Sequence, residues 1–265
     1  MAGELEQAHK ALRELGKALK NLPNAPAPEQ VHKLRTAARR VEALATALPL
    51  GGKKKTRELL DAIEPLRKAA GGIRDIDVLK IHARKLNRLA AGDAIARLIE
   101  QLDFSRLHSA AALKRELGSR REKTRAHLKQ YAKLLDAAKS GAQHQSEIHP
   151  AAMRALRELA TWPPLDAANL HGFRLKVKRL RYILQLDSEA APGLVEALGQ
   201  VQHFVGDWHD WQQLEERARE LLDAQKDAAT LARIEQATKR RYTAALKAAN
   251  SLRATYLLPP RATGI

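Results

Sequence analysis

Two stretches of the sequence place histidine, arginine and lysine at spacings that bring them to one side of an α-helix. In VHKLRTAARRVEAL, which begins at Val31, His32, Arg35 and Arg39 lie at i, i+3 and i+7, and residues so spaced are neighbours on a helix surface. LHGFRLKVKRLRYI, which begins at Leu170, repeats this spacing. Arginine can bind phosphate oxygens through paired hydrogen bonds, and lysine adds a mobile point charge. The spacing predicts two helical surfaces that suit a flexible chain of phosphates.

The basic residues occupy one side of each predicted helix, and apolar residues occupy the other. The apolar stripes, which we expect to face the core, are Leu34, Ala37, Ala38, Val41 and Leu44 in the first stretch and Phe173, Val177, Leu180 and Leu184 in the second. The basic sides consist of His32, Lys33, Arg35, Arg39 and Arg40, and of His171, Arg174, Lys178, Arg179 and Arg181. A merely solvated helix face has the same pattern. The binding interpretation therefore depends on its recurrence and on the net charge.

The sequence contains an internal repeat. The two basic stretches align at an offset of 139 residues, and KAAGGIRDIDVL aligns with HFVGDWHDWQQL at an offset of 135, which pairs Gly71 with Gly206. Two motifs in the same order indicate a duplication. We expect a single domain over residues 1–265, made of two related helical bundles across a pseudo-two-fold axis. The first half spans about residues 1–140 and the second about 150–265.

Asp75 and Asp210 take equivalent places in the second motif, each after a basic residue near an expected helix start. A carboxylate there can cap free backbone amides or orient a neighbouring arginine, so we assign both a structural role, with direct ligand or metal binding as the alternative. The ten histidines form no HExxH motif and no compact ligand cluster, so we predict no metal site. His209 and Asp210 could imitate a catalytic dyad, but no serine lies in a nucleophile-elbow context. We predict neither a catalytic residue nor a cofactor.

The composition favours helices and a polyanionic partner. Hydrophobic residues make up 45% of the chain but aromatic residues only 4%, and Ala and Leu carry most of the apolar content. Such a mixture favours helices, since strands draw on β-branched and aromatic residues. The 47 Lys and Arg against 30 Asp and Glu give a net charge of +17, whose repulsion a polyanion would offset. The absence of cysteine excludes disulfides and thiolate chemistry. The predicted fold class is all-α.

Apolar periodicity and turn signals predict the helices. Their expected spans are about 4–22, 29–47, 54–70, 73–90, 93–139, 151–161, 167–187, 193–205, 208–224 and 227–250. Helix breaks are therefore expected at Gly71-Gly72 and between residues 205 and 208, and SGAQHQSEIHP, residues 140–150, is the expected linker between the halves. The first residues lack a signal-peptide core, and no apolar run is long enough to span a membrane. We expect a cytoplasmic protein that does not act in a membrane.

Four of these segments resemble a known family. VHKLRTAARRVEAL, GGIRDIDVLK, LHGFRLKVKRLRYIL and VGDWHDWQQL are similar to the recurring segments of the CHAD family, the conserved histidine α-helical domain, over roughly residues 25–250. The resemblance implies two pseudo-symmetric helical bundles with a basic surface and channel that bind inorganic polyphosphate, and association with polyphosphate granules in some members. By motif match, the histidine and basic positions of the family fall on His32, Arg35, Arg39, Arg40, His171, Arg174, Lys178 and Arg179. We add Lys33, Arg74 and Arg181 as further candidates.

The sequence departs from the family pattern at one acidic position. Gln212 stands where the first half has Asp77, so a symmetric role for this second acid is in doubt. CHAD domains often accompany a triphosphate-tunnel hydrolase domain with an ExExK signature on a strand. The nearest string here, Glu4-Leu5-Glu6, lies in a helical pattern and lacks the lysine. We expect a stand-alone member, with any hydrolase on a separate polypeptide.

Two other functions stay open at this point. The main alternative is a nucleic-acid-binding protein. Its binding would be independent of sequence, because nothing in the chain resembles a helix-turn-helix reader or an RNA-stacking sheet. A phosphatase or polyphosphate-metabolising enzyme is the third, although the sequence offers no acidic metal cluster. The leading hypothesis is a non-enzymatic module that binds polyphosphate or a similar phosphate or sulfate polyanion.

Overall fold

The structure is all-helical, as the composition predicts. The computed structural model describes residues 2–48, 50, 52–89, 92–140, 148–185 and 190–257, and every regular element among them is a helix. The elements are α1 (Ala2–Lys20), α2 (Pro28–Ala47), α3 (Gly52–Leu89), α4 (Asp93–Ser140), α5 (Ile148–Ala160), α6 (Leu170–Leu184), α7 (Pro192–Leu221), α8 (Ala228–Leu252) and a π-helical turn, η1 (Arg253–Leu257).

The chain divides into two compact units. Unit 1 comprises Met1–Ile148 with Leu186–Ser188 and holds α1–α4; unit 2 comprises His149–Gln185 with Glu189–Ile265 and holds the later helices. Residues 141–147 of the predicted linker lie outside the described residues. A pseudo-two-fold relation between the halves stays a prediction.

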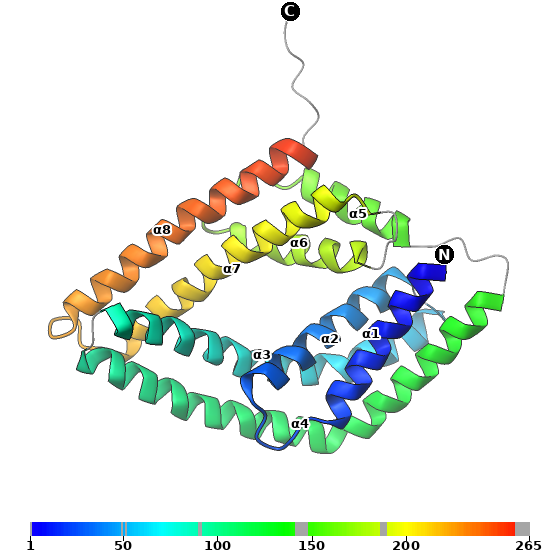
Figure 1. Cartoon of the computed structure of the whole chain (residues 1–265), viewed down its shortest axis with the longest axis horizontal. Coiled ribbons are helices and arrows are strands. Elements are labelled where there is room, and N and C mark those ends of the chain that lie inside the picture. The colour runs from blue at the N-terminus through cyan, green and yellow to red at the C-terminus, as the bar shows by residue number, and fades with distance from the viewer. Residues whose placement is uncertain are drawn as a thin grey trace, which may run out of the picture. The chain divides into compact units, whose positions relative to one another are not determined.

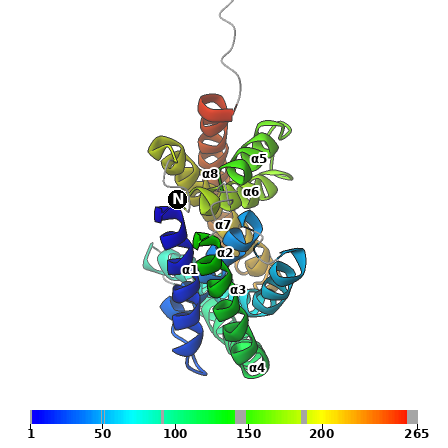
Figure 2. The same cartoon turned by 90° about the vertical axis from the view of Figure 1, so that its right-hand side faces the viewer.

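Unit 1 is built around contacts of α2 and α4. Helix α2 packs against α1 and α3, while the long α4 runs along α3 and also contacts α1 (Figure 1). In the view turned by 90°, the long α3 and α4 are foreshortened, whereas α1 is still seen from the side (Figure 2). The predicted apolar stripe of α2 is confirmed, because all of its members are buried: Leu34, Ala37, Ala38, Val41 and Leu44. The basic residues of α2 are thereby confined to its remaining surface.

Unit 2 has its core between α6, α7 and α8. Helix α6 packs on α7, and α7 packs along α8 (Figure 1). The predicted apolar stripe of α6 is also confirmed by the burial of Phe173, Val177, Leu180 and Leu184. Arg253 in η1 donates hydrogen bonds to the backbone oxygens of Pro163 and Trp162, both at 2.6 Å. This contact ties the end of the helical region to the segment before α6.

Two expected helix interruptions are wrong. Helix α3 continues through Gly71-Gly72, and α7 continues through Gly206. A glycine inside a helix costs only about 1 kcal/mol relative to alanine, which packing along a long partner helix can outweigh. The glycines of α3 and α7 therefore have another role, which the contacts around them reveal.

A buried ion pair joins three segments of unit 1. Arg106 of α4 donates through Nε to Oδ1 of Asp77 on α3 at 2.6 Å and through Nη2 to the backbone oxygen of Pro26 at 2.9 Å. The Asp77 side chain is 4% exposed. Gln212 instead donates to Glu216 on its own helix, on the surface, at 3.2 Å. The acid that lacks a counterpart in the second half is thus a packing residue of unit 1.

None of the described helices has a stretch long and apolar enough to cross a lipid bilayer.

Candidate polyanion-binding faces

Two arginines of α6, Arg174 and Arg181, pack against glycines of α7. The Arg174 guanidinium lies so close to Gly206 that a Cβ added there would be 2.8 Å from Nη2. Arg181 lies in the same way against Gly199, with Nε 3.5 Å from an added Cβ, and donates to the amide oxygen of Gln202 at 3.2 Å. Glycine at these α7 positions provides the room for the two guanidinium groups. This set of α6 side chains against α7 is called the unit 2 face below.

Two histidines complete the unit 2 face. The rings of His171 on α6 and His209 on α7 lie 3.9 Å apart between centroids. Burial and, to a lesser extent, the neighbouring His171 and Arg174 lower the pKa of His209 to about 4. Burial, followed by Arg174 and Lys178, also lowers the pKa of His171. At neutral pH both rings are therefore uncharged. Arg174, Arg181 and Lys178, which lies near His171, carry the positive charge of this face.

The lowered pKa of His209 makes the stability of the fold depend on pH. In the unfolded chain the ring returns to a pKa near 6.5, so at lower pH the unfolded state binds a proton that the folded state does not. The free energy of unfolding should therefore fall as the pH falls from about 6.5 to about 4. We expect His209→Gln to lose less in Tm than the wild type between about pH 7 and pH 5, as measured by thermal unfolding followed by circular dichroism. His203→Gln, an exposed site on the same helix, is the control, and parallel profiles for His209→Gln and wild type would contradict the prediction.

The corresponding contact in unit 1 joins α2 to α3. A Cβ added at Gly71 would lie 3.5 Å from Nε of Arg35, whose Nη2 lies 3.4 Å from Oδ1 of Asp75. Arg39 Nη1 lies 4.0 Å from Glu42, which Arg67 of α3 approaches to 2.5 Å. An arginine of each predicted basic stretch thus lies against a glycine of the next packed helix. We call Arg35 and Arg39 with their α3 neighbours the unit 1 face.

At one repeated contact between helices, the arginine lies on the second helix in unit 1 and on the first helix in unit 2. The offset of 139 places Glu42 where the second half has Arg181, and the offset of 135 places Arg67 where it has Gln202. In unit 2 the arginine is on α6, and in unit 1 it is on α3. Sequence comparison of the basic stretches alone missed Arg67, although its α3 position follows from the second offset.

The first predicted basic row does not stay together. Arg35 lies toward α3, whereas His32, Lys33 and Arg40 line a cleft between α2 and α1. Arg40 Nη1 is 2.6 Å from Glu14 of α1. The cations of α2 therefore serve two separate flanks of the helix, and carboxylates from neighbouring helices partly neutralise both.

The other predicted residues are placed by their helices. Arg74 and Lys178 are half-buried, and Arg179 is exposed. Asp75 and Asp210 lie well inside α3 and α7, so the expectation that they cap helix starts is wrong. The other structural role considered, orientation of a neighbouring arginine, is present for Asp75, which forms an ion pair with Arg35. His209, Gly71 and Gly206 belong to the faces although sequence analysis gave them other roles.

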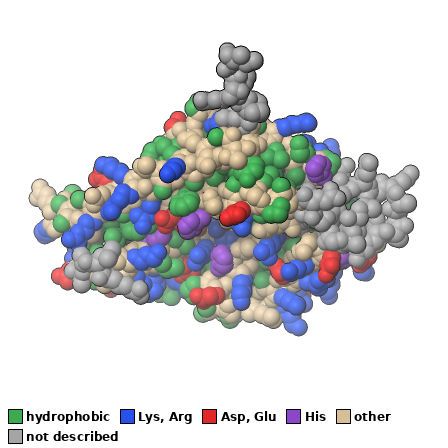
Figure 3. All heavy atoms as spheres, turned by 45° about the horizontal axis from the view of Figure 1, so that its top comes forward, with side chains coloured by type: hydrophobic (Ala, Val, Ile, Leu, Met, Phe, Trp, Pro, Cys, Tyr) green, Lys and Arg blue, Asp and Glu red, His purple; other side chains and the backbone are tan. Residues whose placement is uncertain are grey.

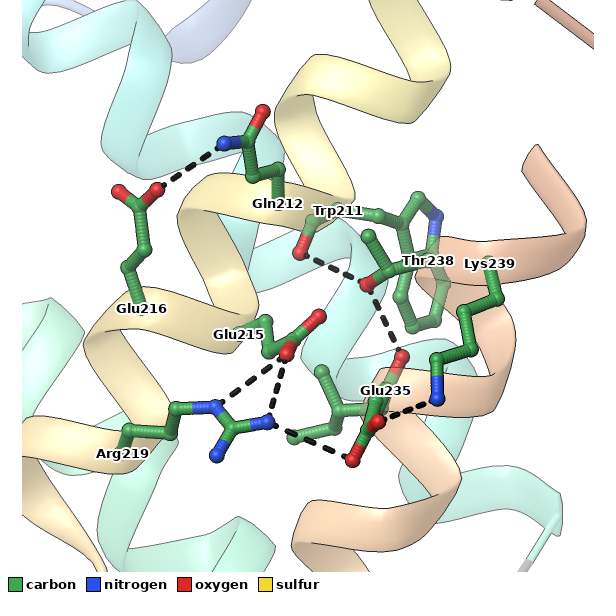
Figure 4. Close-up of polar contacts among 9 residues, drawn as sticks. Trp211, Gln212, Glu215, Glu216, Arg219, Glu235, Thr238 and Lys239 are labelled. Atoms are coloured by element: carbon green, nitrogen blue, oxygen red, sulfur yellow. Dashed lines mark hydrogen bonds and ion pairs between the residues drawn. The ribbon is translucent and has the colours of Figure 1, made fainter. Parts of the chain in front are cut away.

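Cations outside the two faces also pair with acids. Lys and Arg side chains are spread over the surface in Figure 3, with Asp and Glu among them. On α7, Arg219 donates to Glu215 at 2.8 Å and lies 3.4 Å from Glu235 of α8, which also binds Lys239 at 2.5 Å (Figure 4). Carboxylates thus pair with cations in this region as they do on the unit 1 face, where Arg67 contacts Glu42.

Groups of three or more His, Asp or Glu side chains that could hold a metal ion do not occur among the described residues. The donor set of the two faces consists instead of guanidinium and ammonium groups. These groups hydrogen-bond to oxyanions.

Comparison with known proteins places the chain in a family. The model of the CHAD domain matches residues 6–218. Among solved structures, PptA from Streptomyces chartreusis has a TM-score of 0.67 at 17% identity and covers 95% of this chain and 96% of its own. The CHAD domain from the plant Ricinus communis has a TM-score of 0.61 at 21% identity, over 95% and 89%. No curated protein matches. The family match spans most of the chain, and the protein belongs to the CHAD domain family.

Proposed function

We propose that this protein binds inorganic polyphosphate through the unit 1 face and the unit 2 face. The observation that carries the proposal is the repeated placement of an arginine, Arg35 or Arg174, against a glycine of the neighbouring helix. Packing of this kind limits the motion of the guanidinium groups, so less conformational entropy is lost when they bind a phosphate. The family resemblance supports phosphate polymer as the ligand.

Partial burial favours phosphate contacts on these faces. The Arg35 and Arg39 side chains are 26% and 29% exposed, and charges near a protein surface interact more strongly than charges in bulk water. A long polymer can occupy several such sites at once, which raises its affinity above that of any single contact. The function proposed is binding without chemical conversion, and association with polyphosphate granules would follow wherever a cell stores the polymer.

Competition between polyanions tests this function against nucleic-acid binding. The protein is loaded with fluorescent duplex DNA at near-physiological salt. It is then titrated either with long-chain polyphosphate or with unlabelled DNA, and the two competitors are compared at equal phosphate concentration. We expect polyphosphate to displace the DNA at a lower phosphate concentration than DNA itself does. The reverse order would favour the nucleic-acid alternative, and phosphate release from polyphosphate in the presence of Mg²⁺ or Mn²⁺ would favour an enzyme.

Gly71 and Gly206, which are equivalent positions of the repeat, give a matched pair of variants. In Gly206→Ala the new methyl group would meet Arg174 Nη2 at 2.8 Å and displace the guanidinium, whereas in Gly71→Ala it would meet Arg35 at an ordinary 3.5 Å. Alanine raises helix stability by up to about 1 kcal/mol at either position. We expect both variants to keep or gain stability, but only Gly206→Ala to lose polyphosphate affinity, by about threefold to tenfold. Equal affinities of the two variants for polyphosphate would mean that the placement of Arg174 does not matter.

A further inference from the structure

A cleft in unit 1 lies apart from the α2–α3 contact. It has a volume of about 600 Å³ and lies between α1 and α2. Four basic residues line it, Lys17 from α1 and His32, Lys33 and Arg40 from α2, together with one carboxylate, Glu14. Small-molecule sites typically have volumes of roughly 300–1,000 Å³. The cleft thus has the size and the charge of a site for a small anion.

Apolar residues of the cleft increase the electrostatic attraction between its cations and a bound anion. Leu22 and Ala37 line it and are themselves buried. Side chains of this kind lower the local dielectric constant, so the attraction between a cation and an anion above them is larger than in open solvent. Thr36 adds a hydroxyl group to the α2 wall, which can donate to a phosphate oxygen.

An anion in the cleft would compete with the Glu14 carboxylate for Arg40. Arg40 Nη1 lies 2.6 Å from Glu14 Oε2, and both side chains are more than a third exposed. A phosphate that enters the cleft gains Arg40 as a bidentate partner, but it is repelled by Glu14 at the same time. Glu14 therefore lowers the affinity for any anion bound at Arg40.

We propose that the α1–α2 cleft binds the di- or triphosphate group of a small anion, with Arg40, Lys33 and Lys17 as its partners. The group could belong to free tripolyphosphate or to a nucleoside triphosphate. The site is distinct from the unit 1 face, so polymer binding by Arg35 and Arg174 does not require it.

Two variants that break the same ion pair test the site. Arg40→Ala and Glu14→Gln both remove the ion pair between α1 and α2, but the first removes a ligand and the second removes a repulsive charge. Measured by calorimetric titration with tripolyphosphate, Arg40→Ala should weaken binding about tenfold or more. Glu14→Gln should strengthen it about threefold. A loss of affinity in both variants would mean that the ion pair only holds the helices together, and would overturn the proposal.

Matched controls separate local charge from net charge. Arg57→Ala and Glu122→Gln make the same changes of charge on α3 and α4 of unit 1, at side chains that are 85% and 77% exposed, and should leave tripolyphosphate affinity unchanged. Parallel titrations with ATP and with long-chain polyphosphate identify the source of the phosphate group. Tighter binding of ATP than of tripolyphosphate, weakened by Arg40→Ala, assigns the cleft to a nucleotide. If only the long polymer binds, the cleft proposal fails, while the proposed polymer-binding function stands.

Discussion

Replacing Arg35, Arg39, Arg174 and Lys178 together by alanine is expected to lower the affinity for long-chain polyphosphate by about a thousandfold. Each of these side chains can supply a charge-assisted contact, for which about 1 kcal/mol is a conservative value at a partly exposed site. Four such contacts correspond to roughly three orders of magnitude in the dissociation constant. Equilibrium binding of labelled polymer, measured by fluorescence anisotropy, is the direct test.

The salt dependence of the same variant gives a second measure. Each phosphate that is neutralised by the protein releases a counterion, and for a single-stranded polyanion the slope of log K against log salt is about −0.7 for each contact. Removing four contacts should therefore make the slope less steep by about 3. An affinity loss without a change in slope would mean that the variant had lost its structure and not its phosphate contacts.

A variant of equal charge provides the control for this experiment. It replaces two cations in each unit that lie beside surface carboxylates: Arg57 and Arg125 in unit 1, Arg219 and Lys239 in unit 2. All four control residues lie outside the two faces, and Arg219 and Lys239 share Glu235 as a partner (Figure 4). We expect a loss of less than about tenfold. If the two quadruple variants lose affinity equally, net charge alone governs binding and the proposed faces have no special role.

The helices and their buried sides could be predicted from the sequence because both follow from local periodicity. The stripes that begin at Leu34 and Phe173 recur every three or four residues, and only one side of α2 or α6 can be covered by a neighbour. The repeat offset also paired Gly71 with Gly206, the glycines that contact Arg35 and Arg174. These features depend on residues that are close in sequence or aligned by duplication.

The continuity of α3 and α7 could not be predicted in the same way. A glycine pair within a polar stretch usually marks a turn, and the propensity penalty at Gly71 or Gly206 gives no sign of what packs there. The arginine that fills the space lies on another helix, in each case more than 30 residues earlier in the chain. The glycine was recognised as a repeated residue, but its role as a close contact needed the tertiary structure.

The division of the α2 cations also depends on tertiary partners. Lys33, Arg35 and Arg40 are close in sequence, but the acids that hold Arg35 and Arg40 come from α3 and α1. A helical projection of α2 shows which residues share a side and not which carboxylates lie opposite them. The predicted single row therefore becomes one face toward α3 and one cleft toward α1.

Asp77 gives the largest effect expected on stability. Its carboxylate is almost fully buried against Arg106, and Arg106 also binds the backbone of the segment before α2. Removing one partner of a buried pair leaves the other charge without compensation, which costs about 3–5 kcal/mol. We expect Asp77→Ala to lower the free energy of unfolding of unit 1 by that amount, as measured by urea unfolding followed by far-ultraviolet circular dichroism.

The same experiment can separate a loss of charge pairing from a loss of packing. Replacing both members, in Asp77→Ala with Arg106→Met, should recover part of the lost stability, because no buried charge is then left alone. Asp61→Ala, on the same helix but 69% exposed and 3.9 Å from Arg57, should change the free energy of unfolding by less than about 1 kcal/mol. All three tryptophans lie in unit 2, so their fluorescence follows that unit while circular dichroism follows every helix. If the double variant is no more stable than Asp77→Ala, the pair contributes through packing of the two side chains and not through their opposite charges.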